Sequence, residues 1–354
     1  MKKFPSIKQY RNAISAVRQH AQYVGDDENG EPICDRSVDM PVLKMIGTVK
    51  LHGTNAAIVR TTKDKSITYQ SRERELSLTE DNAGFMMYMS KKTDIINSMF
   101  DRIMSSVPVP LSIAIYGEWY GGNVQPHVAL NQLPKMFVIF GIKAYHGETD
   151  INGDEVGVWL DTQSLKHVHS AEDKIFNIYN FPTFEVEIDF NHPELVTNKI
   201  VEMTIAVENE CPVAKQLGAT GIGEGLVFAP AFNEGSEYQH SCFWFKSKGE
   251  KHSASKCKKL MSVDVESIQA IKEFCEYAVT DTRLEQGLNN LMNEQLKPFE
   301  MTSMGDFIRW VYNDIVKEET DTIVENQLDM KKLGGPIANI SRKWYTEKYN
   351  NSPL

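Results

Sequence analysis

The sequence predicts an α+β protein, with antiparallel sheets and flanking helices in its first two thirds and a small all-α region after them. Two observations support this class. Short β-branched and aromatic runs, most with turn residues nearby, fill the chain from about residue 41 to 245, which is typical of antiparallel strands rather than of regular βαβ units. After residue 259 the apolar residues recur instead at three- and four-residue steps, the spacing of helices.

The first helix is expected within the first two dozen residues, where Tyr10, Ile14, Val17 and Ala21 form one apolar stripe. Turn formers and acidic residues at 25–32 end it. Strands are then expected at 45–49, 56–60, 66–70, 112–116, 136–142, 156–160, 184–188, 226–229 and 243–246. One helix is expected to interrupt them over residues 82–104, where large apolar residues cluster at helical spacing.

The last third is expected to be helical. One helix is indicated by the apolar steps from Val265 to Ala278, and a second by those from Phe307 to Ile315. The Gly-Gly-Pro segment at 334–336 is expected to stop the chain before a last helix that contains Trp344.

Length and composition predict two domains. The chain has 354 residues, of which 41% are hydrophobic and 24% charged, so it can bury a core. We place the boundary near 250–262 and the domains at 1–255 and 256–354. Apolar runs stay well short of the roughly 18–20 residues that span a bilayer, and the five cysteines include no C-x-x-C pair. We therefore expect a cytoplasmic monomer that does not associate with membranes.

Charge is unevenly distributed along the chain. The formal net charge is −10, and residues 142–235 carry 16 acidic against 5 basic residues. Residues 246–259 carry six lysines and one glutamate. A strip of this kind can bind phosphates on an otherwise acidic protein, although an isolated lysine run is more often a solvated turn.

The most informative segment is Lys50-Leu51-His52-Gly53-Thr54-Asn55, between two expected strands. A lysine close to a glycine in such a turn can bring its amine against phosphates that approach the backbone closely. To act as a nucleophile the amine must be neutral, so its pKa, near 10.4 in a free side chain, must fall. Nearby cations lower the pKa of a lysine because they disfavour the ammonium form.

Four further segments carry groups that suit a nucleotide. Glu118 follows a hydrophobic strand and can accept hydrogen bonds from ribose hydroxyls, and Phe140 can stack on a base. Glu224 precedes a strand, at a position suited to Mg²⁺. Lys246 and Lys248 are two residues apart, so on a strand both project from one face, where two ammonium groups can hold a phosphate oxygen.

Taken in order, these five segments resemble the covalent nucleotidyltransferase superfamily of ATP-dependent ligases and mRNA capping enzymes. The K-x-H-G-T-N segment resembles more closely the RNA ligase 2 family, which includes bacteriophage RNA ligases and trypanosome RNA-editing ligases. DNA ligases and capping enzymes usually carry Asp where this chain has His52. The resemblance covers about residues 41–250 and implies a nucleotidyltransferase domain at 1–255, with an RNA-engaging helical domain after it.

The resemblance implies a role for each position. Lys50 would attack the α-phosphate of ATP and hold AMP, with His52, Gly53 and Asn55 in the same nucleotide site. Arg72 would contact the nucleotide and the RNA end. In the other segments, Glu118 would bind the ribose and Phe140 would stack on adenine. Glu224 would bind Mg²⁺, and Lys246 and Lys248 would bind the α-phosphate. The expected function is ATP-dependent joining of RNA 3′-hydroxyl and 5′-phosphate ends in RNA repair, nicked duplex being one candidate substrate.

The chain departs from the family pattern at two positions. The phage ligases usually have Asp where this chain has Gly141, and they tend to have a basic residue where it has Ala229. Two other functions therefore stay open: a DNA ligase or guanylyltransferase of the same superfamily, and a non-catalytic protein that binds RNA ends. A phage-encoded protein acting in the host cytoplasm is compatible with the resemblance.

Overall fold

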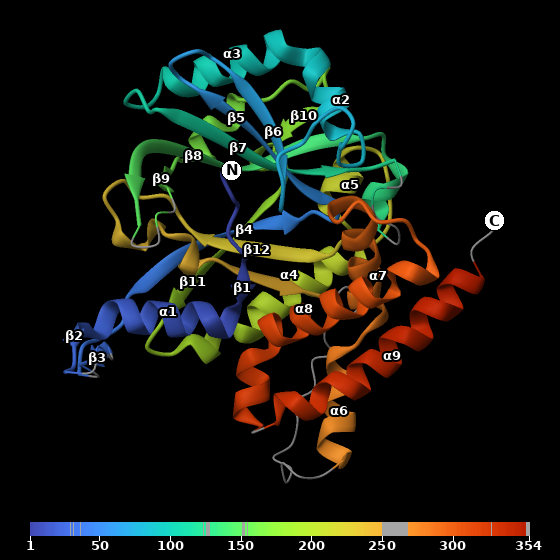
Figure 1. Ribbon diagram of the computed structural model, residues 1–354. Coiled ribbons are helices and arrows are strands. Elements are labelled where there is room, and N and C mark those ends of the chain that lie inside the picture. Colours follow the sequence, from blue (N-terminus) through green and yellow to red (C-terminus); the bar gives the residue numbers. More distant parts are fainter. Residues whose placement is uncertain are drawn as a thin grey trace. The chain divides into compact units, whose positions relative to one another are not determined.

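The computed structural model describes residues 1–249 and 268–351, apart from residues 29, 31, 36, 123, 125–127, 151, 152, 154 and 327. The chain divides into two compact units, residues 1–249 and 250–354. The first is α+β and the second helical, so the predicted fold class is confirmed (Figure 1). The predicted boundaries, near 250–262 and between 255 and 256, lie outside the described residues. Among the described residues, none of the helices is long and apolar enough to cross a membrane.

Two larger sheets form the centre of the first unit. The first sheet has the strand order β1 (Lys8–Gln9), β13 (Phe245–Lys248), β12 (Gly225–Pro230), β4 (Val42–Lys50) and β11 (Thr183–Asp189). The second has the order β10 (Ile175–Asn177), β8 (Met136–Thr149), β7 (Ser112–Tyr120), β5 (Thr54–Thr61) and β6 (Ile67–Ser71), with β9 (Glu155–Trp159) also paired to β8. The pairs β1–β13 and β10–β8 are parallel, and the other described pairs of the two sheets are antiparallel.

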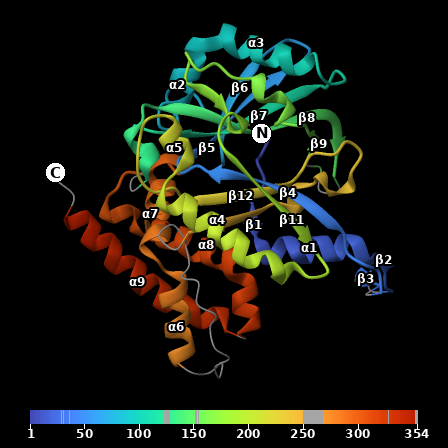
Figure 2. The same ribbon diagram turned by 180° about the vertical axis from the view of Figure 1, so that it is seen from behind.

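Helices lie on the outer faces of these sheets (Figures 1 and 2). On the outer side of the second sheet lie α2 (Phe85–Met89) and α3 (Thr93–Met104). The first sheet is covered by α1 (Tyr10–Gln22) and α4 (Thr197–Asn209), and the short helix α5 (Pro212–Gln216) follows α4. A small antiparallel pair, β2 (Tyr23–Asp26) and β3 (Pro32–Cys34), follows α1.

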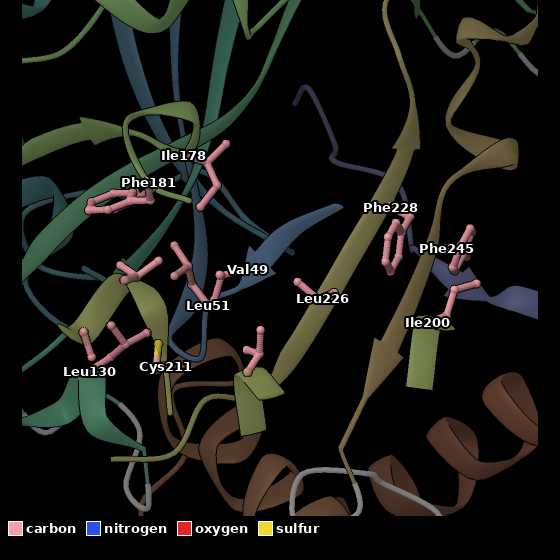
Figure 3. Close-up of a cluster of buried hydrophobic side chains, with 14 of the residues drawn as sticks. Val49, Leu51, Leu130, Ile178, Phe181, Ile200, Cys211, Leu226, Phe228 and Phe245 are labelled. Atoms are coloured by element: carbon pink, nitrogen blue, oxygen red, sulfur yellow. The ribbon is translucent and has the colours of Figure 1, made fainter. Parts of the chain in front are cut away.

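The largest described core cluster of this unit includes the helix-covered face of the first sheet (Figure 3). Leu226 and Phe228 of β12 and Phe245 of β13 are fully buried there, and Ile200 of α4 packs in the same cluster. The Phe228 and Phe245 rings stack with centroids 4.9 Å apart. Because side chains alternate along a strand, this burial directs Lys246 and Lys248 to the other face, toward the second sheet.

The second unit is built from α6 (Ile268–Ala278), α7 (Asp281–Asn289), α8 (Met304–Glu325) and α9 (Met330–Asn350). Its core includes Phe307 and Val311 of α8. Arg283 of α7, whose side chain is 1% exposed, lies 2.9 Å from Asp314 and 3.1 Å from the equally buried Glu319. The predicted start of the first helix at Val265 lies outside the described residues.

Two predicted elements are present but begin later than expected. The helix predicted over 82–104 begins at Phe85, because the Asp81 carboxylate accepts hydrogen bonds from Met86 and Met87 N–H at the helix start, and a 3₁₀ turn separates its two parts. The strand predicted at 243–246 begins at Phe245, after a 3₁₀ turn. The sequence pattern also gave no sign of α4, α5 or the parallel strand β10.

The Gly-Gly-Pro segment at 334–336 does not stop the chain but lies inside α9. Proline costs roughly 3 kcal/mol inside a helix, and the preceding Gly335 has no Cβ to meet its ring. Leu333, Ile337 and Tyr345 lie on one apolar stripe that crosses the proline, and all three are fully buried. Burial of this stripe therefore outweighs the local cost of the proline.

Candidate active site

Two of the predicted lysines, Lys50 and Lys248, lie on either side of Gly225, where three neighbouring strands of the first sheet meet at their ends. Lys50, the last residue of β4, pairs with Gly225, the first residue of β12. Gly225 pairs on its other side with Lys248, the last residue of β13. Gly225 has φ +145°, and a Cβ there would lie 2.1 Å from the Ser247 carbonyl oxygen, so the position requires glycine. Glu224 directly precedes it and lies between the two lysines.

Glu224 connects the charged groups. Its side chain is only 1% exposed, and the Lys50 Nζ donates a hydrogen bond to its Oε2 at 2.7 Å. The His52 Nδ1 lies 3.1 Å from the same oxygen. The Lys248 Nζ lies 3.0 Å from the other oxygen, Oε1. One buried carboxylate therefore holds two lysines and a histidine that sequence analysis selected separately.

The chain crosses from the first sheet to the second at residues 51–53, between β4 and β5. The Gly53 N–H donates a hydrogen bond of 2.9 Å to Glu118 Oε1 on β7. A Cβ at Gly53 would lie 2.3 Å from the Trp119 carbonyl oxygen, so a larger residue would push the two segments apart. Asn55 pairs with Glu118 in the sheet register. The crossing thus joins Lys50 on one sheet to Glu118 on the other.

These contacts shift the pKa values of Lys50 and Glu224. Burial acts to lower the pKa of Lys50, but attraction to the Glu224 and Glu118 carboxylates outweighs it, and the pKa is raised. Burial acts to raise the pKa of Glu224, but Lys50, Lys248 and His52 outweigh it, and the pKa lies well below its usual value. With the protein groups alone, Lys50 and Glu224 therefore form an ion pair. This result differs from the sequence-based expectation of a lowered lysine pKa.

The other two buried groups are shifted toward their neutral forms. Burial raises the pKa of Glu118 to about 7, with Lys50 opposing and Glu224 adding to the shift. Burial lowers the pKa of Lys248 to about 8; the Glu224 carboxylate opposes this shift, and the charges of Lys50 and Lys246 add to it. Each group is thus poised to lose or gain a proton near neutral pH, as is common at functional sites.

Lys246 lies two residues before Lys248 on β13. The residue between them, Ser247, points to the helix side, where its Oγ lies 2.7 Å from Thr204 Oγ1 of α4. Lys246 and Lys248 therefore share the opposite face of the strand, as the sequence predicts for i and i+2 positions.

Arg72 and Phe140 contact residues other than Glu224. The charge of Arg72 acts on both Lys50 and Glu118, and its Nη2 donates to Ser6 Oγ at 3.3 Å. Phe140 lies at a bulge of β8, where the register passes from Tyr116–Gly141 to Gly117–Ile139. A bulge of this kind redirects a side chain, and the half-buried Phe140 ring lies 4.8 Å from the ring of Phe4.

Three residues that support the site have no motif that predicts them: Asn82, Phe4 and Ser6. Asn82, fully buried, donates a hydrogen bond of 2.9 Å to Oγ1 of Thr54, within the segment that begins at Lys50. Phe4 and Ser6 contact Phe140 and Arg72 from the start of the chain. The turn signal at residues 82–84 could have indicated Asn82, but Phe4 and Ser6 follow no pattern that marks them.

An RNA ligase family model matches residues 43–248, more than half of the chain. The chain belongs to the RNA ligase family. The matched segment contains every site residue predicted above, and it ends at Lys248.

Among solved structures, the chain is similar to Naegleria gruberi RNA ligase. A lysine-to-alanine mutant of that enzyme with ATP and Mn aligns at 17% identity and a TM-score of 0.42, over 71% of this chain and 57% of that one. The same ligase with PPi aligns at 19% identity and a TM-score of 0.39, over 71% and 56%. The aligned region thus spans little more than half the length of those chains. No curated protein matches this chain.

Proposed function

We propose that this RNA ligase family member uses ATP to join RNA 3′-hydroxyl and 5′-phosphate ends, first through an AMP group on Lys50 and then through an RNA-adenylate. The observation that carries the proposal is the joint placement of Lys50 and Lys248 on the buried carboxylate of Glu224, with Glu118 directly across the sheet crossing. An amine beside a second cation suits nucleophilic attack on a phosphate, because the cations offset the charge of the phosphate group.

Lys50 is the nucleophile in this proposal. Its ammonium group gives a proton to water, and the neutral amine forms a bond to the α-phosphorus of ATP while the bond to pyrophosphate breaks. An RNA 5′-phosphate oxygen then attacks the same phosphorus and the amine leaves. In the last step a 3′-hydroxyl attacks the 5′-phosphorus of the adenylated end, AMP leaves, and a phosphodiester remains.

The remaining groups position the nucleotide. Lys246 and Lys248 neutralise the α-phosphate, and because the pKa of Lys248 is about 8, its charge responds to the phosphate that binds. Glu118 accepts hydrogen bonds from the ribose, and Phe140 stacks on adenine. Further contacts come from His52, which orients Glu224, from Gly53 and Asn55 at the sheet crossing, and from Arg72.

Glu224 suits a divalent cation such as Mg²⁺. Its Oε1 is buried and accepts no hydrogen bond from the described residues, with the Lys248 Nζ as an ionic neighbour at 3.0 Å. The described residues contain no group of three or more His, Cys, Asp or Glu that could hold a metal, so Glu224 would share the ion with phosphate oxygens and water, as is common for Mg²⁺. Such an ion would supply positive charge that offsets the negative charge of the phosphates. It would also weaken the attraction between Glu224 and the Lys50 ammonium group.

The domain roles belong to the same proposal. Residues 1–255 form the adenylyltransferase domain, and residues 256–354 engage RNA. The protein acts as a cytoplasmic monomer in RNA repair, with nicked duplex as one candidate substrate. Membership in the RNA ligase family supports RNA ends over DNA ends and ATP over GTP.

Labelling with ATP tests this function. Wild type incubated with α-³²P-ATP and Mg²⁺ is expected to carry label that survives denaturation, and Lys50→Ala is expected to carry none. Lys44→Ala is a matched control, because Lys44 lies on the same strand and pairs with Glu185 while more than half exposed. An unlabelled wild type contradicts the proposal, and RNA-end binding without labelling would favour the non-catalytic alternative. Labelling by GTP in place of ATP would favour a guanylyltransferase.

A further inference from the structure

The segment formed by residues 2–9 contacts both large sheets of the first unit. The Lys2 backbone N–H donates to the Gln70 side chain on β6 at 3.0 Å, and its ammonium pairs with Glu155 on β9. At the other end of the segment, β1 pairs with β13, and Gln9 lies opposite Lys246. These contacts fix both ends of the segment, one on each sheet.

Phe4 lies between these two ends, in a group of aromatic rings. Its ring centroid is 4.8 Å from that of Phe140, in an edge-to-face arrangement. Tyr116, Trp159 and Trp244 lie at 5.3, 5.6 and 6.3 Å. Tyr116 is two residues before Glu118 on β7, so the rings continue the same face of the sheet as the ribose-binding candidate.

Gly141 makes room for this arrangement. A Cβ there would lie 3.1 Å from the Trp159 ring and 3.5 Å from the Phe4 ring. A side chain at this position would be crowded against the Trp159 ring and would reach ordinary van der Waals contact with the Phe4 ring. The absence of a side chain at Gly141 therefore leaves room for the Trp159 and Phe4 rings beside Phe140.

The segment also contacts a second candidate nucleotide-binding residue, because Ser6 Oγ accepts a hydrogen bond from Arg72 at 3.3 Å. Three predicted site residues, Phe140, Arg72 and Lys246, thus have a partner within residues 2–9. These partners lie outside the segment that the family model matches.

We propose that Phe4 is a positioning residue of the nucleotide site, which holds the Phe140 ring in the orientation that stacks on the base. The inference rests on the proposed function for the identity of the ligand. Edge-to-face packing restricts the rotamers of a half-buried phenylalanine, and its loss is expected to weaken ATP binding roughly three- to tenfold. The chemical step at Lys50 does not involve Phe4, so its maximal rate is expected to stay unchanged.

The test measures the rate of covalent labelling against ATP concentration. Phe4→Ala is expected to raise the apparent KM for ATP with the maximal rate unchanged, and Phe4→Tyr is expected to restore it. Phe176→Ala is the matched control, because Phe176 is also a half-buried ring of this unit, with its ring partner Phe181 at 5.7 Å. This control is expected to lower the melting temperature but to leave the KM unchanged.

An unchanged KM in Phe4→Ala, or an equal rise in Phe4→Ala and Phe176→Ala, would overturn the proposal. Equilibrium binding of a non-hydrolysable ATP analogue measures the same contact without chemistry. If ATP does not label the wild type, the ligase function is refuted but the role of Phe4 is not. If the wild type and Phe4→Ala bind the analogue with equal affinity, the role of Phe4 is refuted.

Discussion

Glu118→Gln should stabilise the protein at alkaline pH while it reduces ATP labelling. Glutamine keeps the oxygen that accepts the 2.9 Å hydrogen bond from Gly53, so the substitution removes the ionisation and little else. A neutral side chain avoids the unfavourable transfer of a carboxylate from water into the site. Activity is expected to fall because the carboxylate is the proposed ribose acceptor.

The size of the effect follows from the raised pKa. The pKa of Glu118 is about 7 in the folded protein, against a reference value of 4.5. At about 1.4 kcal/mol per pH unit, this difference corresponds to up to about 3.5 kcal/mol. Since the unfolded chain ionises first, the wild type loses this stability as the pH rises from 4.5 through 7, and the loss is complete above 7.

Urea unfolding followed by tryptophan fluorescence measures this difference. The free energy of unfolding of Glu118→Gln should exceed that of wild type at pH 8, and the two should converge below pH 4.5. Comparing the two proteins at each pH cancels the titration of groups that do not interact with Glu118. A difference that does not change with pH, or a variant less stable than wild type at pH 8, would refute the reasoning.

Three further predictions concern other parts of the chain. Arg283→Met should lower the free energy of unfolding by about 3–5 kcal/mol, because it leaves Glu319 buried without this cation. The control Arg309→Met, at a side chain that is 74% exposed, should change it by less than about 0.5 kcal/mol. Urea unfolding measures both values. Gly53→Ala should abolish ATP labelling, since its Cβ would meet backbone at 2.3 Å, while Gly305→Ala, with open space around it, should label normally and be equally or more stable. RNA binding should weaken steeply between 50 and 200 mM salt despite the net charge of −10, and a flat titration would show that the lysines of residues 246–259 do not contact phosphates.

Much of the fold could be predicted because its strands and helices have clear periodicities. The runs that contain Met45, Ala56 and Leu226 all lie in observed strands, and the stripe that begins at Tyr10 is a helix. The continuation of α9 across Pro336 could not be predicted, because local propensity is outweighed there by burial that involves residues distant in the sequence.

The candidate site could be predicted residue by residue but not as an arrangement. Motif spacing selected Lys50, Glu224 and Lys248, while their convergence depends on the strand order β13–β12–β4, which the local pattern does not encode. The bulge at Phe140 and the contact from Phe4 arise only after the sheets form. The raised pKa of Lys50 likewise follows from its distance to Glu224, which a sequence does not contain.

The shared carboxylate of Glu224 also limits how this chain can change in evolution. If Glu224 were lost first, two lysines and a histidine would face one another without their common counter-ion. If a lysine were lost first, the protein would keep its fold more easily but lose the proposed chemistry. In a related protein that no longer needs the proposed chemistry, we therefore expect the lysines to be substituted before the glutamate. The order of these substitutions would show which residue is needed for the charge balance of the folded protein.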